Sequence, residues 1–320
     1  MRLIARLAGL AALLLAPAGA SALDKVKVAI GQGTTFDTAF AIAGKTAGFF
    51  EKHGIDPEFL VTSGGGETLQ AVISGSVDIG IAAGTTGVLG AFAKGAPVRV
   101  ISAQYQGTDE SYVYVPAASP IKSFRETDGK TVAFSTVGAS TYTLVTGLAE
   151  RYGVKPKFVA TGSIPATYAA TMSGQVDVGW AAVPFGLQDL KDGKIRALGW
   201  GSEAGAMSTQ TVRVNIAHAG VLAGRRDALA KFMAAYEEAL EWSYKSPEAL
   251  KAISTLIGFP EPLVDEVRAK HMSLERASIH EIRNLEQSMK DAIEFKYISA
   301  PLTPAQVAEL FQLSAVLTKQ

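Results

Sequence analysis

Residues 73–84 read ISGSVDIGIAAG, and residues 172–182 read MSGQVDVGWAA, 99 positions further along the chain. The likeness extends upstream, because EKHGIDPEFLVT at 51–62 matches ERYGVKPKFVAT at 150–161 with the same offset. Over one gapless stretch of 33 positions that contains both matches, 14 residues are identical. Each copy has the pattern of a strand, a helix and a strand. The repeat therefore predicts two similar α/β lobes with a cleft between them.

The residues around the first copy have the pattern of a doubly wound α/β lobe. KVKVAIG at 25–31 alternates as a strand does, and a helix is expected over about residues 38–53. The strand PEFLVT, a glycine-rich turn, a helix through Ile73 and the strand DIGIAA follow. The second copy starts with the strand KTVAFST at 130–136 and continues with a helix near 140–152. This alternation predicts a mostly parallel sheet in each lobe.

Two segments are candidates for passing the chain between the lobes. VRVISAQYQGTDESYVYV at 98–115 is one long β-rich stretch, and a second crossing is expected near 198–213. We therefore expect the first part of lobe 1 at 23–104, lobe 2 at 105–205, and the return to lobe 1 with the C-terminal helices at 206–320.

The chain has a helical pattern from about Asp227 onward. Ser246 before Pro247, and Thr303 three residues before Gln306, have the patterns of helix N-caps. We expect these helices to pack on lobe 1 or behind the cleft. Apolar residues at three- and four-residue spacing form a stripe that we interpret as core: Leu229, Phe232, Met233, Tyr236 and Leu240.

The N-terminus has the order of a secretory signal peptide. Arg2 and Arg6 precede an apolar run at 7–16, and Ala20 and Ala22 occupy the small-residue positions before a cleavage site. The run is too short to cross a bilayer, which needs about 20 residues. No cysteine follows it that could carry a lipid. We expect cleavage after Ala22 and a freely soluble periplasmic product.

Composition and missing motifs exclude several classes of function. Cleavage leaves 298 residues with 28 basic and 30 acidic side chains, a balance that gives no reason to expect a nucleic-acid partner. The absence of cysteine excludes disulfides, thiolate nucleophiles and cysteine metal sites. The four histidines lack metal-binding spacing, and there is no G-x-S-x-G elbow, P-loop or helix-opening G-x-G-x-x-G. We expect a binding protein that is not an enzyme and needs no metal or cofactor.

Short loops follow five of the expected strands, and all of them except the one at 182–185 are rich in glycine, serine or threonine. Ligands bind open α/β sheets at the carboxyl ends of the strands, where helix N-termini attract anions. None of these loops contains lysine or arginine, so neutral donors would surround a ligand with a single negative charge. Each hydroxyl could instead cap the helix that follows it. The loops lie at 31–36, 63–66, 84–86, 135–141 and 182–185.

Several single residues have two interpretations. Asp37 either caps a helix or meets an ammonium group of the ligand. Trp180, whose repeat partner is Ile81, belongs either to the core or to a stacking wall of the cleft. Asp78 and Asp177 are interpreted as structural, because each precedes a strand where a carboxylate satisfies turn amides. The aromatic residues expected near the cleft are Phe36, Tyr105, Tyr142, Trp180 and Phe185.

These stretches together resemble a known family. AFAIAGKTAGFFEKHGIDPEF at 39–59, the glycine turn, LQAVISGSVDIGIAAG at 69–84 and the second repeat with Trp180 are similar to periplasmic solute-binding proteins. These belong to nitrate, sulfonate, taurine and thiamine-pyrimidine-precursor ABC importers, and GFFEKHGID is close to the family's hallmark. The resemblance covers about residues 25–245. It implies a type II periplasmic-binding-protein fold that closes on a small molecule and presents it to an inner-membrane permease. We expect a monomer.

The ligand itself stays open, because the chain departs from the common family pattern at 34–37. The first hypothesis is a small organic anion, such as a sulfonate, taurine, nitrate or a carboxylate. The alternatives are an aromatic or heterocyclic ligand, or a sensing module that docks on a membrane receptor. A pyrimidine-precursor synthase would need a cysteine-rich segment that the chain lacks. The expected ligand-binding residues are Gln32, Thr34, Thr35, Phe36, Ser63, Gly64, Thr85, Thr86, Tyr105, Ser140, Thr141, Trp180 and Pro184.

Overall fold

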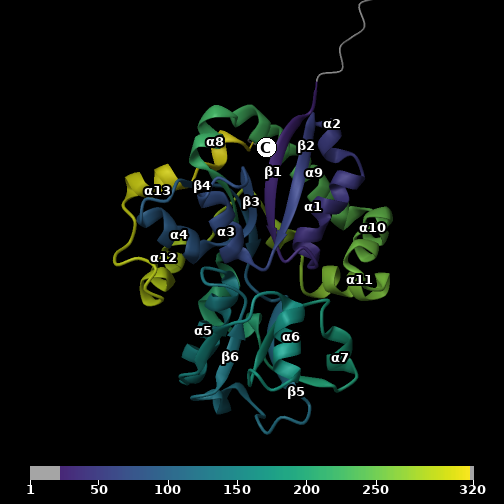
Figure 1. The fold of residues 1–320 in the computed structure, drawn as a ribbon, viewed down its shortest axis with the longest axis vertical. Coiled ribbons are helices and arrows are strands. Elements are labelled where there is room, and N and C mark those ends of the chain that lie inside the picture. Colours follow the sequence, from purple (N-terminus) through teal and green to yellow (C-terminus); the bar gives the residue numbers. More distant parts are fainter. Residues whose placement is uncertain (1–21, 318–320) are drawn as a thin grey trace, which may run out of the picture.

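A computed structural model describes residues 22–317, apart from the side chains of Ala206 and Met207. Two α/β lobes lie one above the other, with the purple and blue lobe 1 at the top of Figure 1 and the teal lobe 2 below it. Residues 1–21 of the expected signal peptide lie outside the described residues. Within the described residues, no helix is both long and apolar enough to cross a membrane.

Lobe 1 is built on a five-stranded sheet in the order β2-β1-β3-β10-β4. Strands β1, β2 and β3 are parallel, whereas β10 runs antiparallel to both β3 and β4. Every residue of β3 is buried, as expected for an apolar strand that is covered on both faces. The strands are β1 (Asp24–Gly31), β2 (Ile55–Thr62), β3 (Ile79–Gly84), β4 (Val98–Gln106) and β10 (Thr211–His218).

Lobe 2 repeats this arrangement. Strand β6 (Thr131–Phe134) pairs in parallel with β7 (Lys157–Ala160), and β5 (Ser111–Pro116) pairs antiparallel with β8 (Gly179–Ala182) and β9 (Ile195–Trp200). A parallel bridge between Val132 and Val178 joins the two groups. The order β7-β6-β8-β5-β9 therefore matches that of lobe 1. The predicted fold class, two doubly wound α/β lobes, is confirmed.

The chain crosses twice between the lobes. The first β-rich stretch is two strands in two sheets, β4 and β5, joined by residues 107–110. The second crossing leads from β9 to β10 through the short turns Gly201–Glu203 and Gly205–Thr209. Each crossing connects the edge strand of one sheet to the strand next to the edge in the other. The two crossings therefore lie between the lobes and have equivalent places in them.

The helices of the repeats follow the sequence pattern with one correction. The helix expected over 38–53 is divided into α1 (Phe36–Thr46) and α2 (Phe49–Lys52). Gly48 between them has a left-handed φ of 86°, which interrupts helical hydrogen bonding. The others are α3 (Gly65–Ile73), α4 (Thr85–Ala93), α5 (Ser140–Tyr152), α6 (Ile164–Met172) and α7 (Leu187–Lys191).

The C-terminal helices pack on lobe 1. Helices α9 and α10 contact α1, α12 contacts α4, and α13 contacts β4, and Figure 1 shows them on both sides of that lobe. The predicted apolar stripe of α9 is buried, and the N-caps at Ser246 and Thr303 are confirmed. The helices are α8 (Ala219–Gly224), α9 (Arg226–Lys245), α10 (Pro247–Ile257), α11 (Glu261–Lys270), α12 (Leu285–Glu294) and α13 (Pro304–Leu310).

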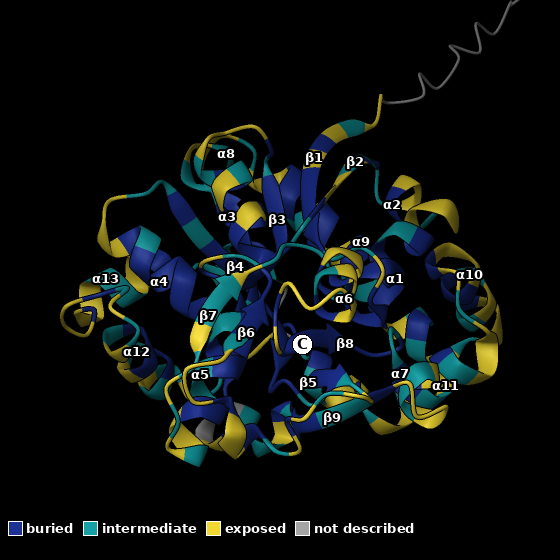
Figure 2. Ribbon diagram, turned by 60° about the horizontal axis from the view of Figure 1, so that its bottom comes forward, coloured by how far each residue is buried: buried dark blue, intermediate teal, exposed yellow. Residues whose placement is uncertain are grey.

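The repeated aspartates hold equivalent strand starts in the two lobes. Asp78 Oδ2 accepts a hydrogen bond from Lys27 N at 2.9 Å, and Asp177 Oδ2 accepts one from Thr131 N at 2.8 Å. The interpretation of both carboxylates as structural is therefore confirmed. Figure 2 shows strands such as β3 and β8 buried inside the lobes, with exposed helix faces outside.

Candidate functional site

The two lobes touch through glycines that leave no room for a side chain. A Cβ atom built on Gly66 would lie 2.0 Å from the carbonyl oxygen of Val137 in lobe 2. A Cβ atom on Gly84 would lie 2.2 Å, and one on Gly87 2.4 Å, from the carbonyl oxygen of Gly138. Real Cβ contacts do not come this close. These three glycines therefore allow the 137–138 loop of lobe 2 to seat against lobe 1.

A central cavity of about 40 Å³ lies between the lobes. Loops at the carboxyl ends of strands in both lobes contribute to it, as expected for this class of sheet. The lining residues are Gly31, Gln32, Thr35, Asp37, Thr38, Gly64, Gly65, Ala82, Glu110, Ser111, Ser135, Ala139, Ser140, Thr141, Ile164, Trp180, Ala182 and Arg213.

Six of the predicted ligand-binding residues line this central cavity: Gln32, Thr35, Gly64, Ser140, Thr141 and Trp180. Gln32 spans the lobes, since its Nε2 donates to the carbonyl oxygen of Ser63 and its Oε1 accepts from Ile164 N at 3.5 Å. In lobe 2, Thr141 Oγ1 lies 2.7 Å from Ser135 Oγ. These six residues come from three of the five predicted loops and from strand β8.

The other seven predicted residues lie outside the cavity: Thr34, Phe36, Ser63, Thr85, Thr86, Tyr105 and Pro184. Thr34 is exposed, and Phe36 packs edge-on against Tyr244 in the core of lobe 1. Ser63 N donates to Glu67 Oε2 at 2.7 Å, at the start of α3. Pro184 lines a separate groove between α7 and α11.

Three of the hydroxyls among these seven have protein partners of their own. Thr85 Oγ1 donates to the carbonyl oxygen of Thr211 at 2.7 Å, and Thr86 Oγ1 lies 3.3 Å from Thr143 Oγ1. Tyr105 OH donates to the carbonyl oxygen of His271 at 3.1 Å. These side chains support neighbouring segments and do not point into the cavity.

Of the expected aromatic set, Trp180 alone lines the cavity. It is 1 % exposed, and its Nε1 has no hydrogen-bond partner within residues 22–317. Trp180 therefore belongs to the core and to the cavity wall at once. Tyr142 packs against Phe134, and Phe185 packs against Tyr168. Of the five aromatic residues expected near the cleft, the cavity lining therefore keeps one indole ring.

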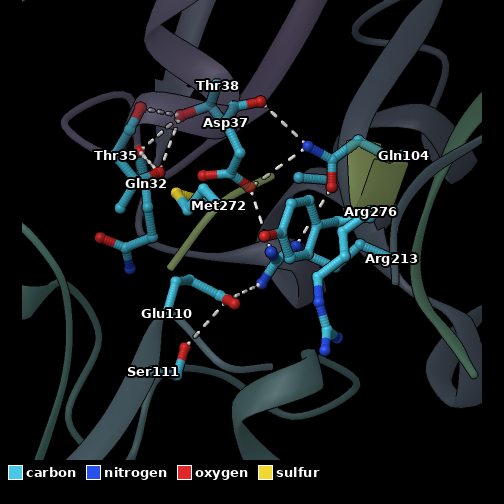
Figure 3. A network of polar contacts seen from close by, with 12 residues as sticks. Gln32, Thr35, Asp37, Thr38, Gln104, Glu110, Ser111, Arg213, Met272 and Arg276 are labelled. Atoms are coloured by element: carbon cyan, nitrogen blue, oxygen red, sulfur yellow. Dashed lines mark hydrogen bonds and ion pairs between the residues drawn. The ribbon is translucent and has the colours of Figure 1, made fainter. Parts of the chain in front are cut away.

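The expectation of a neutral lining was wrong, because three charged residues meet at the cavity (Figure 3). Arg213 Nη1 lies 2.7 Å from Glu110 Oε1, and Arg213 Nη2 lies 3.2 Å from Asp37 Oδ2. Arg213 Nε donates to Gln104 Oε1 at 3.1 Å, and Gln104 Nε2 donates to the Asp37 backbone oxygen at 2.9 Å. Asp37 thus meets a cation of the protein itself.

These three residues form the charged cluster Asp37–Glu110–Arg213. Asp37 was among the candidates from the sequence, whereas Glu110 and Arg213 were not, for a topological reason. Glu110 ends the first crossing and Arg213 lies on β10, just after the second, so neither belongs to a glycine-rich loop. The one sequence feature that could have indicated them is charge within β-rich segments that were expected to cross between the lobes.

Burial dominates the electrostatics of the charged cluster. Burial raises the pKa of Glu110, and the nearby guanidinium of Arg213 offsets this only in part. Burial lowers the pKa of Arg213, but the carboxylates of Glu110 and Asp37 more than offset it, so the net pKa lies above the ordinary value. The guanidinium also lies 4.8 Å from the centre of the Tyr105 ring.

Three helix N-termini also face the cavity. The first turns or N-caps of α1, α3 and α5 contribute lining residues, and none of the three N-cap residues makes a side-chain cap hydrogen bond. In α3, Gly66 N donates instead to Thr136 Oγ1 of lobe 2 at 3.1 Å. Uncapped N–H groups and the helix dipole attract negative charge. Gln32 and Ala82, which also line the cavity, have left-handed φ angles of 56° and 65°. Such strained backbone is concentrated at functional sites.

Solved structures with the same fold cover nearly the whole chain. The alkanesulfonate-binding protein SsuA from Xanthomonas axonopodis pv. citri, bound to MOPS, has a TM-score of 0.72 at 19% identity over 93% of this chain and 98% of its own. The nitrate-binding protein NrtA from Synechocystis PCC 6803 has a TM-score of 0.70 at 14% identity, over 92% and 87%. A search of curated protein sequences finds no match.

These likenesses confirm the periplasmic-binding-protein fold that the sequence predicted. A family model described as NMT1/THI5 like matches residues 35–250, which is more than half of the chain and contains both repeats. The chain therefore belongs to the NMT1/THI5-like family, whose fold it shares with periplasmic solute-binding proteins.

Proposed function

We propose that this protein captures a small solute in the central cavity and delivers it to the permease of an ABC importer. The observation that carries the proposal is the cavity itself, which strand-end loops of both lobes enclose where the lobes touch. The binding of an alkanesulfonate-type ligand by SsuA and of nitrate by NrtA, which have the same fold, supports it. In this role the protein is not an enzyme and acts as a monomer in the periplasm, after removal of residues 1–22.

Capture requires the lobes to separate and close again. The cavity lies between the lobes, and the 137–138 loop is seated on lobe 1 next to the lining residue Ala139, so we expect a solute to enter when these glycine contacts are open. The two crossings are the covalent connections about which such a hinge motion would turn. A solute that contacts both lobes stabilises the closed form by its extra contacts with the second lobe. The permease would recognise this closed form.

The ligand that we place first is a small organic anion, such as a sulfonate, nitrate or a carboxylate. The free N–H groups at the N-termini of α1, α3 and α5, together with the hydroxyls of Ser140 and Thr141, provide donors for an oxyanion. An aromatic or heterocyclic ligand has less support, since Trp180 is the single aromatic residue in the lining.

Titration of the chain without its signal peptide tests this function. Sulfonates, carboxylates, nitrate and pyrimidines would be added separately, and binding would be followed by calorimetry and by the shift in melting temperature. We expect one class of small solute to bind with one site per chain and to raise the melting temperature. No response to any solute of the panel would contradict solute capture.

A further inference from the structure

Glu110 lines the cavity, and one of its carboxylate oxygens has no hydrogen-bond partner within residues 22–317. The side chain is 1 % exposed, and its Oε1 accepts from Arg213 Nη1 at 2.7 Å and from Ser111 Oγ at 3.1 Å. Its Oε2 is buried and has no hydrogen-bond partner in the described part of the chain. Leaving a buried acceptor unpaired is unfavourable, and more so for a charged group. This oxygen therefore fits a donor that comes from outside the protein.

The charged cluster also leaves an excess of negative charge. It contains two carboxylates and one guanidinium, and their side chains are between 1 % and 11 % exposed. Gln104, the remaining polar partner of Arg213 and Asp37, is neutral. The neighbouring cation Arg276 is paired with Asp109 at 2.7 Å, so it does not supply the missing positive charge. The cavity consequently combines free N–H groups at helix N-termini with a net negative cluster.

We infer that the captured solute carries a protonated amine in addition to its anionic group, and that Glu110 Oε2 accepts a hydrogen bond from this amine. The inference rests on the proposed function and specifies the substrate class of the same site. The anionic group would lie at the N-terminal turns of α3 and α5, and the amine at the charged cluster. The small volume of the cavity favours a compact zwitterion, such as an aminoalkyl sulfonate or a short amino acid.

The test compares solutes that differ only in the amine. Taurine and 1-propanesulfonate have the same shape, with an ammonium group in one replaced by a methyl group in the other. β-Alanine and butanoate form the same pair for carboxylates. Because a hydrogen bond to a charged group contributes about 1.5–3 kcal/mol, we expect the amine of at least one pair to bind about 10- to 100-fold more tightly in calorimetry. This comparison needs no variant.

Two variants then locate the effect. Glu110→Gln keeps the shape of the side chain and removes its charge, and we expect the preference for the amine to fall to about threefold or less. Glu51→Gln removes the same charge from an exposed position in α2 and should leave the preference unchanged. A circular dichroism spectrum confirms that each variant is folded.

Each remaining outcome overturns a defined part of the account. Equal or tighter binding of 1-propanesulfonate and butanoate would overturn the inference and leave solute capture standing. A preference for the amine that survives Glu110→Gln would overturn the assignment to Glu110. If neither pair nor any solute of the wider panel binds, the proposed function fails, and the inference fails with it.

Discussion

Arg213 Nη1 lies 2.7 Å from Glu110 Oε1, and this ion pair joins the two segments by which the chain passes between its lobes. Glu110 ends the first crossing, and Arg213 is the third residue of β10, which follows the second. The same pair lines the central cavity. The ion pair between Arg213 and Glu110 therefore holds the connection between the lobes and also lines the place where a solute would bind.

Removal of Arg213 should destabilise the fold strongly, because it leaves the carboxylates of Glu110 and Asp37 buried without a cation. We expect Arg213→Met to lower the free energy of unfolding by about 3–5 kcal/mol, measured by urea denaturation. Lys290→Met is the matched control, since Lys290 pairs with Glu286 on an exposed helix face, and such pairs contribute at most about 1 kcal/mol. Equal effects of both substitutions would contradict this account of the charged cluster.

The raised pKa of Glu110 gives a pH dependence with a defined sign. Its folded-state pKa lies above the ordinary value of 4.5 because of burial, so the native state holds this proton more tightly than the unfolded state. Its contribution to stability is therefore present below pH 4.5 and is lost as the pH rises through the folded pKa. We expect Glu110→Gln to gain stability relative to the unsubstituted chain as the pH rises above 4.5. Urea denaturation of both proteins at several pH values measures this difference. A constant difference would contradict the assignment.

Substitutions of Ser140 and Thr85 compare a residue that lines the cavity with a residue that only holds a neighbouring segment in place. Ser140 lines the cavity, whereas Thr85 Oγ1 is engaged by the carbonyl oxygen of Thr211. We expect Ser140→Ala to weaken solute binding by about 1–2 kcal/mol through loss of a hydrogen bond to a charged group. Thr85→Ala should lower the melting temperature and leave the affinity of the folded protein nearly unchanged. Calorimetry of both variants tests this, and the reverse order of effects would place the site elsewhere.

Gly87→Ala should act as a wedge between the lobes. The three atoms nearest to the added Cβ would all belong to Gly138 of lobe 2, with the carbonyl oxygen at 2.4 Å. Overpacking costs about 1–3 kcal/mol, which corresponds to about a 5- to 150-fold loss of affinity for a solute that requires closure.

Gly224→Ala in α8 is the control for the wedge, since a Cβ there has no neighbour within 4 Å. Small-angle X-ray scattering should show a larger radius of gyration for Gly87→Ala and no change for Gly224→Ala. An unchanged affinity and radius for Gly87→Ala would show that the contact with Gly138 is not part of closure.

The repeated aspartate of lobe 2 should contribute to stability and not to binding. Asp177 Oδ2 accepts from both the backbone N and the Oγ1 of Thr131, and the backbone hydrogen bond lowers the pKa of this carboxyl. We expect Asp177→Ala to lower the free energy of unfolding by about 0.5–1 kcal/mol, because the carboxylate is exposed. Asp177→Asn should retain part of this contribution to the free energy of unfolding, because its amide oxygen can still accept a hydrogen bond. An effect of Asp177→Ala on solute affinity in calorimetry would contradict a purely structural role.

The repeat predicted the architecture because side-chain periodicity and turn residues determine strands and helices locally. The strand ends at Gln32, Gly64 and Ser140 were found for the same reason, since a parallel sheet places its loops at one edge. What the sequence could not show is which side chain of a strand-end loop turns toward the other lobe. Thr34 next to Thr35 illustrates this, because the first is exposed and the second lines the cavity.

The charged cluster was beyond sequence reasoning because its members are brought together by tertiary pairing alone. Arg213 and Glu110 are 103 residues apart and meet because the two crossings lie side by side. The expectation of a neutral site followed from reading each loop by itself. A polar residue inside a crossing segment has no local partner in the sequence, so its role depends on the strand that packs beside it.

The most direct test of the account is a crystal structure of the chain with the solute that binds most tightly in the titrations. The account predicts that the solute lies between the lobes, with its anionic group at the N-terminal turns of α3 and α5 and contacts to Ser140 and Trp180. A solute bound outside this cavity, for example in the groove between α7 and α11, would contradict the central claim.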